Sequence, residues 1–122
     1  MLLKEVKKHL SANVITGEER LGENIDYGYG CDLMSDVLAF VQNNVLLLTG
    51  LVHPQVIQTA DILDIKAIVI VRGKKINDTF IQMAREKDIT ILTTGYSLFS
   101  ACGILFEKGL QGEEIAHSEF SL

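Results

Sequence analysis

The sequence predicts an α/β fold, in the form of a three-layer α/β/α domain with a mainly parallel sheet. Three continuous apolar runs have the length of strands that are buried on both faces, at residues 45–48, 67–71 and 89–92. A segment with apolar residues at helical spacing follows each run, at residues 54–63, 77–87 and 97–108. Because a strand, a helix and a strand in succession form a right-handed crossover between parallel strands, this alternation predicts a parallel sheet with helices on both faces.

The N-terminal segments are shorter and less regular. Residues 2–10 carry apolar side chains on one helical face and mostly lysines on the other, which predicts a short helix packed on the sheet. Residues 12–16 and 25–29 have strand-like composition and flank the polar, glycine-containing stretch 17–24. We interpret these two pieces as a hairpin or an irregular excursion.

A further helix is expected from Met34, where apolar residues again recur at helical spacing. Asp32 and Ser35 both have the short, oxygen-bearing side chain that caps a helix N-terminus, and either is expected to do so here. The preceding Gly28 and Gly30 are expected to provide positive φ angles in a tight turn. The tyrosine between them is expected either to pack nearby or to touch a ligand.

Composition and length limit the classes of protein to consider. The 122 residues are 48% hydrophobic and 22% charged, which is typical of one compact domain, expected at 1–110 with a C-terminal tail at 111–122. The 11 basic and 16 acidic residues give a net charge of −5, and the basic residues are scattered, so nucleic acid is not an expected partner. The two cysteines lack metal-ligand spacing, and no secretion signal or membrane span is evident. We therefore expect a cytoplasmic protein with no metal site and no membrane partner.

Candidate ligand-binding residues follow the predicted strands. In parallel sheets, ligands gather beyond the carboxyl ends of the strands, where helix N-termini point their free amide groups. The residues expected there are Tyr29, Gly30, Asp32, Ser35, Thr49, Gly50, His53, Arg72, Gly73, Thr94, Gly95 and Ser97. Hydroxyl, imidazole, guanidinium and backbone groups in one crevice would suit a small polar or anionic ligand.

No catalytic motif accompanies these residues. Leu33 stands where a dinucleotide-binding loop requires its third glycine, and the basic run at 72–75 lacks the glycine spacing of a phosphate-binding loop. Cys31 would be a nucleophile only beside a base, which the sequence does not identify. His53 either titrates in a cleft or bonds a helix end, and Cys102 lies on an apolar helical stripe, as in a core. We therefore expect no enzyme activity, no catalytic residue and no cofactor.

The stretches 28–37, 45–49 and 67–73 resemble the DRTGG domain family. The resemblance covers residues 2–110 and is closest to small stand-alone members, of the type encoded near iron-only hydrogenase maturation genes in anaerobic bacteria. It extends more distantly to modules of phosphate acetyltransferases and CBS-domain regulators, and in layout to the N-terminal domains of HPr kinases and Mur ligases. It implies a three-layer α/β fold and a regulatory, non-catalytic role.

These observations lead to one main hypothesis and two alternatives. The main hypothesis is a regulatory or accessory module that binds a small polar or anionic metabolite, such as a nucleotide, and forms a homodimer. The first alternative is a structural protein-interaction subunit, suggested by the apolar Ile115, Phe120 and Leu122 in an otherwise polar tail. The second is an enzyme that uses Cys31 as its nucleophile.

Overall fold

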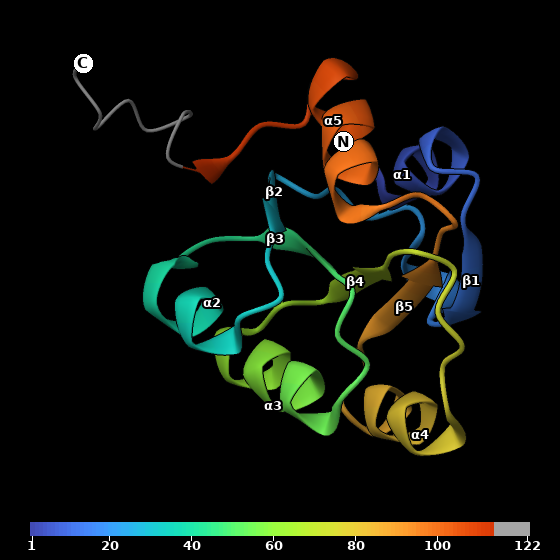
Figure 1. Ribbon diagram of the computed structural model, residues 1–122, viewed down its shortest axis with the longest axis vertical. Coiled ribbons are helices and arrows are strands. Elements are labelled where there is room, and N and C mark those ends of the chain that lie inside the picture. Colours follow the sequence, from blue (N-terminus) through green and yellow to red (C-terminus); the bar gives the residue numbers. More distant parts are fainter. Residues whose placement is uncertain (114–122) are drawn as a thin grey trace.

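The structure, a computed structural model, describes residues 1–113 and contains five strands and five α-helices within them (Figure 1). The strands are β1 (Asn13–Thr16), β2 (Tyr27–Gly30), β3 (Val45–Thr49), β4 (Ala67–Ile70) and β5 (Thr90–Thr93). The helices are α1 (Leu3–His9), α2 (Met34–Phe40), α3 (Pro54–Leu63), α4 (Asp78–Glu86) and α5 (Leu98–Glu107), with a 3₁₀ turn, η1, at Glu18–Arg20.

All five strands form one sheet in the order β1-β5-β4-β3-β2. Strands β2 to β5 are parallel, and β1 pairs with β5 in the antiparallel direction. Helices α1 and α5 cover one face and α2, α3 and α4 cover the other (Figure 1). The predicted three-layer α/β/α fold with a mainly parallel sheet is therefore confirmed.

Two apolar clusters, one on each face, hold the layers together. Successive residues of a strand point to opposite faces, so Leu47 and Ile68 belong to the cluster under α2 to α4, while Leu46 and Val69 belong to the cluster under α1 and α5. Every residue of β3 and β4 is buried. Continuous apolar runs in the sequence thus mark the central strands, because only these strands are covered on both faces.

Of the two alternatives for residues 12–16 and 25–29, a hairpin or an irregular excursion, the hairpin is wrong. Strand β1 lies at one edge of the sheet and β2 at the opposite edge, with three strands between them. Residues 17–24, including η1, instead cross beneath the amino ends of the central strands. Two strand-like pieces separated by a short polar stretch favour a hairpin locally, but here β1 pairs with β5, far along the chain, and β2 pairs with the next strand, β3.

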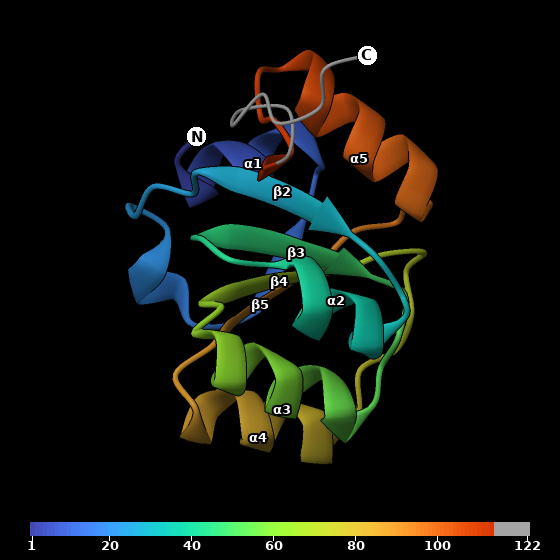
Figure 2. The same cartoon turned by 90° about the vertical axis from the view of Figure 1, so that its left-hand side faces the viewer.

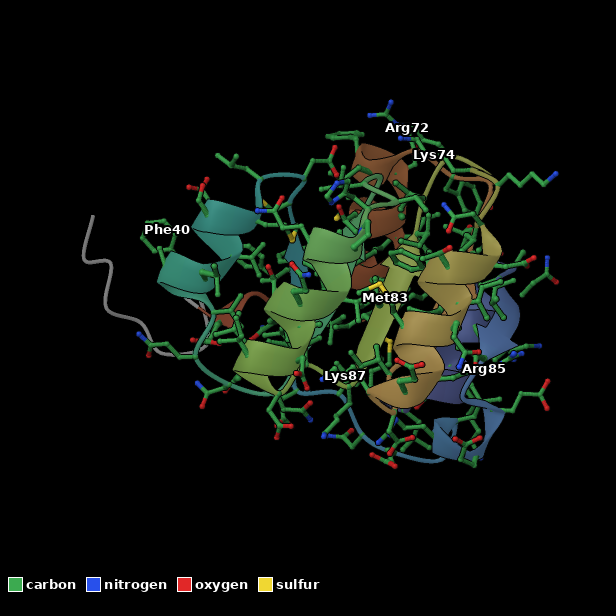
Figure 3. The ribbon with its side chains drawn as sticks, turned by 90° about the horizontal axis from the view of Figure 1, so that it is seen from below. Phe40, Arg72, Lys74, Met83, Arg85 and Lys87 are labelled. Atoms are coloured by element: carbon green, nitrogen blue, oxygen red, sulfur yellow. The ribbon has the colours of Figure 1, made fainter. Side chains whose placement is uncertain are left out.

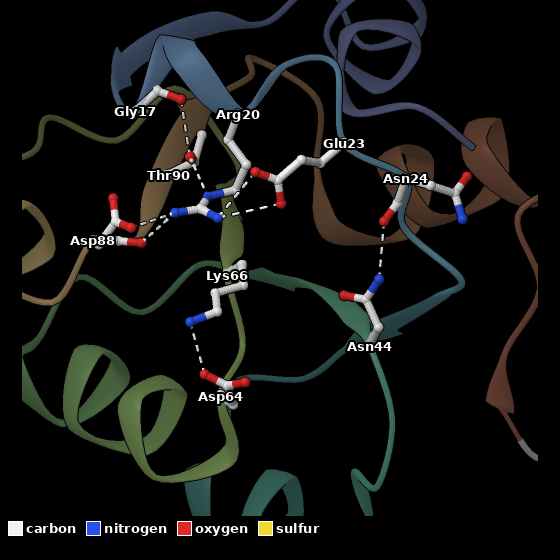
Figure 4. A network of polar contacts seen from close by, with 9 residues as sticks. All are labelled: Gly17, Arg20, Glu23, Asn24, Asn44, Asp64, Lys66, Asp88 and Thr90. Atoms are coloured by element: carbon white, nitrogen blue, oxygen red, sulfur yellow. Dashed lines mark hydrogen bonds and ion pairs between the residues drawn. The ribbon is translucent and has the colours of Figure 1, made fainter.

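The buried side chain of Arg20 joins this crossing segment to β5 (Figure 4). Its Nε donates to Thr90 Oγ1 at 3.3 Å, and its NH2 group donates to the backbone oxygen of Asp88 at 2.8 Å. Ion pairs with Glu23 (3.3 Å) and the Asp88 carboxylate (2.9 Å) complete the network. Thr90 Oγ1 in turn donates to Gly17 O at 3.0 Å, so the segment is attached to β5 through both Gly17 and Arg20.

The expectation that Gly28 and Gly30 provide positive φ angles is also wrong. Both lie in the extended strand β2, and positive φ among the described glycines occurs elsewhere. An added Cβ at Gly30 would lie 2.5 Å from Cys102 Sγ, and one at Gly28 would lie 3.0 Å from Leu110 Cδ2. Glycine is needed at these positions because α5 and the residues after it pack closely on the strand.

The chain after α5 returns to this strand. Gly28 N–H donates to Gln111 O at 3.0 Å, and Gln111 forms an isolated bridge with Tyr27. Ile115, Phe120 and Leu122, on which the protein-interaction alternative rests, lie outside the described residues. Within residues 1–113, no helix is long and apolar enough to cross a membrane.

Candidate functional site

The carboxyl ends of β2, β3, β4 and β5 meet at one end of the sheet, as Figure 2 shows from the side of β2. The loops that follow these strands, at residues 31–33, 50–53, 71–77 and 94–97, form the rim of the candidate site. Because all four strands run in the same direction, this rim collects residues from distant parts of the sequence, as predicted.

Asp32 joins the first two loops of the rim. Its Oδ1 accepts hydrogen bonds from Gly50 N–H at 2.7 Å and from Thr49 Oγ1 at 2.9 Å. The hydrogen bond from Gly50 N–H, helped by Thr49 and by the positive charges of Arg72 and Lys74, lowers the pKa of the Asp32 carboxyl against the opposing effect of burial. The rim therefore favours a negative charge at this position.

The expectation that Asp32 caps the next helix is thus wrong. The N-cap of α2 is Leu33, and no side chain caps that helix. Ser35 lies in the first turn of α2 with its side chain exposed. The capping motif and the observed bonds use the same chemistry, a carboxylate that accepts from backbone N–H groups, and only the fold brings Gly50 close enough to compete for it.

Arg72 and Lys74 place two cations on the rim from the loop after β4. Lys74 Nζ donates to Gly50 O, on the same residue whose N–H group donates to Asp32. Arg72 has a positive φ of 67°, and its N–H group donates to Tyr96 O at 2.7 Å, which fixes its backbone against the loop after β5. The side chain of Arg72 is exposed, and Figure 3 shows it on the same side of the molecule as Lys74.

Two ten-residue helices begin at the rim. His53 caps α3, with Nδ1 accepting from Gln55 N–H at 3.1 Å, and Ser97 caps α5, with Oγ accepting from Ser100 N–H at 3.2 Å. A helix N-terminus carries a partial positive charge and unpaired N–H groups. Both ends therefore add to the preference of the rim for anions.

Other predicted residues are occupied within the fold or lie elsewhere. Thr94 is buried and donates to Leu10 O at 2.7 Å, while Gly73 N–H donates to Thr94 O at 2.8 Å. Gly95 is exposed beside them. Tyr29 packs against the cluster under α2 and α3, and Gly30 lies on the outer edge of the sheet beneath α5.

A pocket of about 180 Å³ lies between β2 and α5, away from the rim. Its lining consists of Gly28, Tyr29, Gly30, Leu48, Cys102, Leu105, Phe106, Leu110, Gln111 and Gly112. The lining is mainly apolar side chains and backbone. The pocket was not expected from the sequence, because its two walls come from segments that are about seventy residues apart in the chain.

Within the described part of the chain, the surroundings of the two cysteines do not favour a nucleophile. Cys31 Sγ accepts from Leu33 N–H at 3.3 Å and donates to Leu33 O at 3.4 Å, so both of these bonds are to the backbone of Leu33. Burial raises the pKa of the Cys102 thiol, which disfavours the reactive thiolate. Among residues 1–113, no cluster of three histidine, cysteine, aspartate or glutamate residues could hold a metal ion.

Replacing Asp32 by alanine is expected to lower the free energy of unfolding by about 1 kcal/mol at neutral pH, since two hydrogen bonds to a largely solvent-exposed carboxylate are lost. The pKa of Asp32 is lower in the folded than in the unfolded chain. Its contribution is therefore complete above the unfolded pKa and disappears as the pH falls through the folded pKa. Urea unfolding at several acidic pH values checks this, because the difference between wild type and Asp32→Ala should shrink towards low pH. A difference that is constant with pH would contradict it.

Comparisons with known proteins address the fold. No protein-family model matches the chain, and no curated protein matches it in sequence. Among solved structures, it is similar to the CBS and DRTGG domains of the regulatory region of Clostridium perfringens pyrophosphatase, crystallised with its activator diadenosine tetraphosphate. The two chains are 18% identical with a TM-score of 0.68, and the match covers 85% of this chain and 45% of the other. This chain therefore corresponds to less than half of that regulatory region, and the likeness supports the predicted DRTGG-like fold.

Proposed function

We propose that this chain is a cytoplasmic, non-catalytic regulatory module that binds a small anionic metabolite of the nucleotide class at the rim. A homodimer is part of the proposal, as is the genetic setting near hydrogenase maturation that the family resemblance implies. The similar pyrophosphatase region is regulatory and was crystallised with a dinucleotide activator, which is compatible with this role.

The observation that carries the proposal is the environment of Asp32. The hydrogen bond from Gly50 N–H lowers the pKa of its carboxyl, with smaller contributions from Thr49 and from the charges of Arg72 and Lys74. The rim thus already stabilises one negative charge built into the chain. With two cations and two helix N-termini around that single carboxylate, the rim has donors left for a phosphate group.

The ligand is expected to bind with its phosphate beside Arg72. The guanidinium group is planar and presents paired N–H donors that match two phosphate oxygens. The backbone of Arg72 is fixed through Tyr96, so its exposed side chain is free to turn towards a ligand while the loop stays in place. No rearrangement of the sheet is required.

Thermal unfolding with ADP, ATP, diadenosine tetraphosphate or inorganic phosphate at about 1 mM tests the proposal, since a ligand of the folded state raises the melting temperature. We expect at least one nucleotide to do so and Arg72→Gln to weaken its binding about tenfold, the loss expected for one charge-assisted contact. Arg85→Gln is the matched control, because Arg85 lies in the last turn of α4, at the other end of the sheet (Figure 3).

Two results would contradict the proposal. One is a folded protein that none of these compounds stabilises. The other is a nucleotide whose binding Arg72→Gln and Arg85→Gln weaken equally, since that would reflect total charge and not the rim. Labelling of Cys31 by an alkylating reagent across neutral pH, together with substrate turnover, would favour the enzyme alternative instead.

A further inference from the structure

Among residues 1–113, no segment pairs with the Gly30 end of the outer edge of β2. Tyr27 N–H and Cys31 N–H donate to Asn44 O and Leu48 O, so the backbone groups of these alternate residues point towards β3. Those of Gly28 and Gly30 must point away from the sheet. Gly28 N–H is taken by Gln111 O. The N–H and C=O groups of Gly30 therefore lie on an exposed edge, and Figure 2 looks directly at it.

Large apolar side chains lie exposed on the two helices that flank this edge. On α5, Phe99 and Phe106 are 89% and 56% exposed, and their spacing of seven residues puts them on one face of the helix. Phe106 and Gly30 line the same pocket, so this face is turned towards β2. On the other layer, Leu33 and Phe40 are 58% and 64% exposed. Leu33 is the N-cap of α2 and Phe40 is its last residue, and Figure 3 shows Phe40 on the side of α2 away from α3.

The same surface carries little charge, although the chain has a net charge of −5. Residues 98–106 of α5 contain no charged side chain, and residues 33–40 contain only Asp36. Two acidic residues border this surface: Glu107, at the end of α5, and Glu113, which accepts from Gln42 N–H and Asn43 N–H. Two copies of an acidic protein repel each other least where they meet through their uncharged surfaces. An acidic chain, an open strand edge and apolar side chains above and below that edge together favour a second copy as the occupant.

We propose that two copies join through the edges of β2, about a two-fold axis that is perpendicular to the sheet and passes between the two Gly30 residues. In this arrangement, Gly30 N–H of each copy donates to Gly30 C=O of the other, and the two sheets continue as one antiparallel junction. Helix α2 then faces its equivalent on one layer, and α5 faces its equivalent on the other. The bond between Gly28 and Gln111 is kept, because the junction uses only the end of the strand beyond it.

The buried area is sufficient for such a contact. Each large apolar side chain offers about 100 Å² at its observed exposure, so the four from each copy, with the strand edges, bury about 1,000 Å² in total. That area is at the lower limit of specific interfaces, and the dimer is therefore expected to be in equilibrium with monomer at micromolar concentrations.

Sedimentation velocity from about 1 to 100 µM tests the interface. We expect the wild type to form a dimer. The single variants Phe106→Glu and Phe40→Glu should each raise the dissociation constant of the dimer about thirtyfold or more, because each substitution buries a charge in the contact. Ile62→Glu is the matched control: Ile62 is 72% exposed on α3, outside this surface, and its variant should dimerise like the wild type. In the wild type, hydrogen exchange of the Gly30 amide should slow as the protein concentration rises.

The interface deepens the proposed dimeric state and rests on it, but it does not require the ligand. A wild type that is monomeric at about 100 µM would overturn both the interface and the dimer. A dimer that Ile62→Glu weakens as much as Phe106→Glu does, or one in which Gly30 exchange is independent of concentration, would overturn the interface alone. The Phe106→Glu variant should bind nucleotide as tightly as the wild type does. Failure of the interface can therefore be distinguished from failure of the proposed nucleotide site at the rim.

Discussion

Alanine at Gly17 is expected to lower the free energy of unfolding by about 3 kcal/mol, the range of a strained left-handed residue combined with overpacking. Gly17 has a φ of +85°, and an added Cβ would lie 2.8 Å from Thr90 Cα. The obstacle is backbone at the first residue of β5, which is held by its pairing with β4 and cannot turn aside. Any relief must move Gly17 away from Thr90 and break the bond from Thr90 Oγ1 to Gly17 O, next to Arg20.

Chemical denaturation measures this effect, with Gly22→Ala as the control. Gly22 lies five residues further along the same segment, has no positive φ, and has open space where a Cβ would be placed. That variant should unfold within about 0.5 kcal/mol of the wild type, as for an ordinary surface substitution. Equal effects of the two alanines would show that the contact with Thr90 does not govern the segment.

Valine at Gly30 is expected to lower the free energy of unfolding by about 2 kcal/mol through overpacking. Its Cβ would lie 2.5 Å from Cys102 Sγ and 3.4 Å from Leu98 Cδ1. Unlike the obstacle at Gly17, these neighbours are side-chain atoms of α5. Removing the sulfur by Cys102→Ala should therefore restore at least half of the loss in the double variant.

A double-mutant cycle measures that recovery. The four proteins are the wild type, Gly30→Val, Cys102→Ala and the double variant, each unfolded in urea. Additive effects of the two substitutions would contradict direct packing between Gly30 and Cys102. Additive effects would instead indicate that Gly30 is needed for its backbone conformation, although that conformation is extended and open to any residue.

The central fold could be predicted because its signals are local. The buried strands β3 and β4 are continuous apolar runs, and His53, Asn77 and Ser97 cap the helices that follow strands β3, β4 and β5. Alternation of such runs leaves one common arrangement, a parallel sheet between helix layers. The rim was predictable for the same reason, since the end of each parallel strand is known once the strand is known.

The role of each rim residue was less predictable. Asp32 precedes a helix, and every local rule assigns it to that helix, but Gly50 and Thr49 bind it across the sheet. Thr94 follows a strand as a ligand-binding hydroxyl would, yet its hydroxyl is used by Leu10. A polar side chain bonds to whichever partner the fold brings near it, and sequence spacing does not include partners from distant strands.

The sequence by itself determined the layer architecture, the parallel central strands and the end of the sheet where polar groups gather, because hydrophobic periodicity and capping act over a few residues. Only the tertiary structure decided that β1 and β2 occupy opposite edges and that Arg20 joins the crossing segment to β5. It also decided that Gly30 has no room for a side chain, because Cys102 packs against it. Each of these depends on contacts between residues about seventy apart in the chain or on which strands lie at the edges of the sheet. Such contacts are set by packing of the whole chain and leave no local pattern.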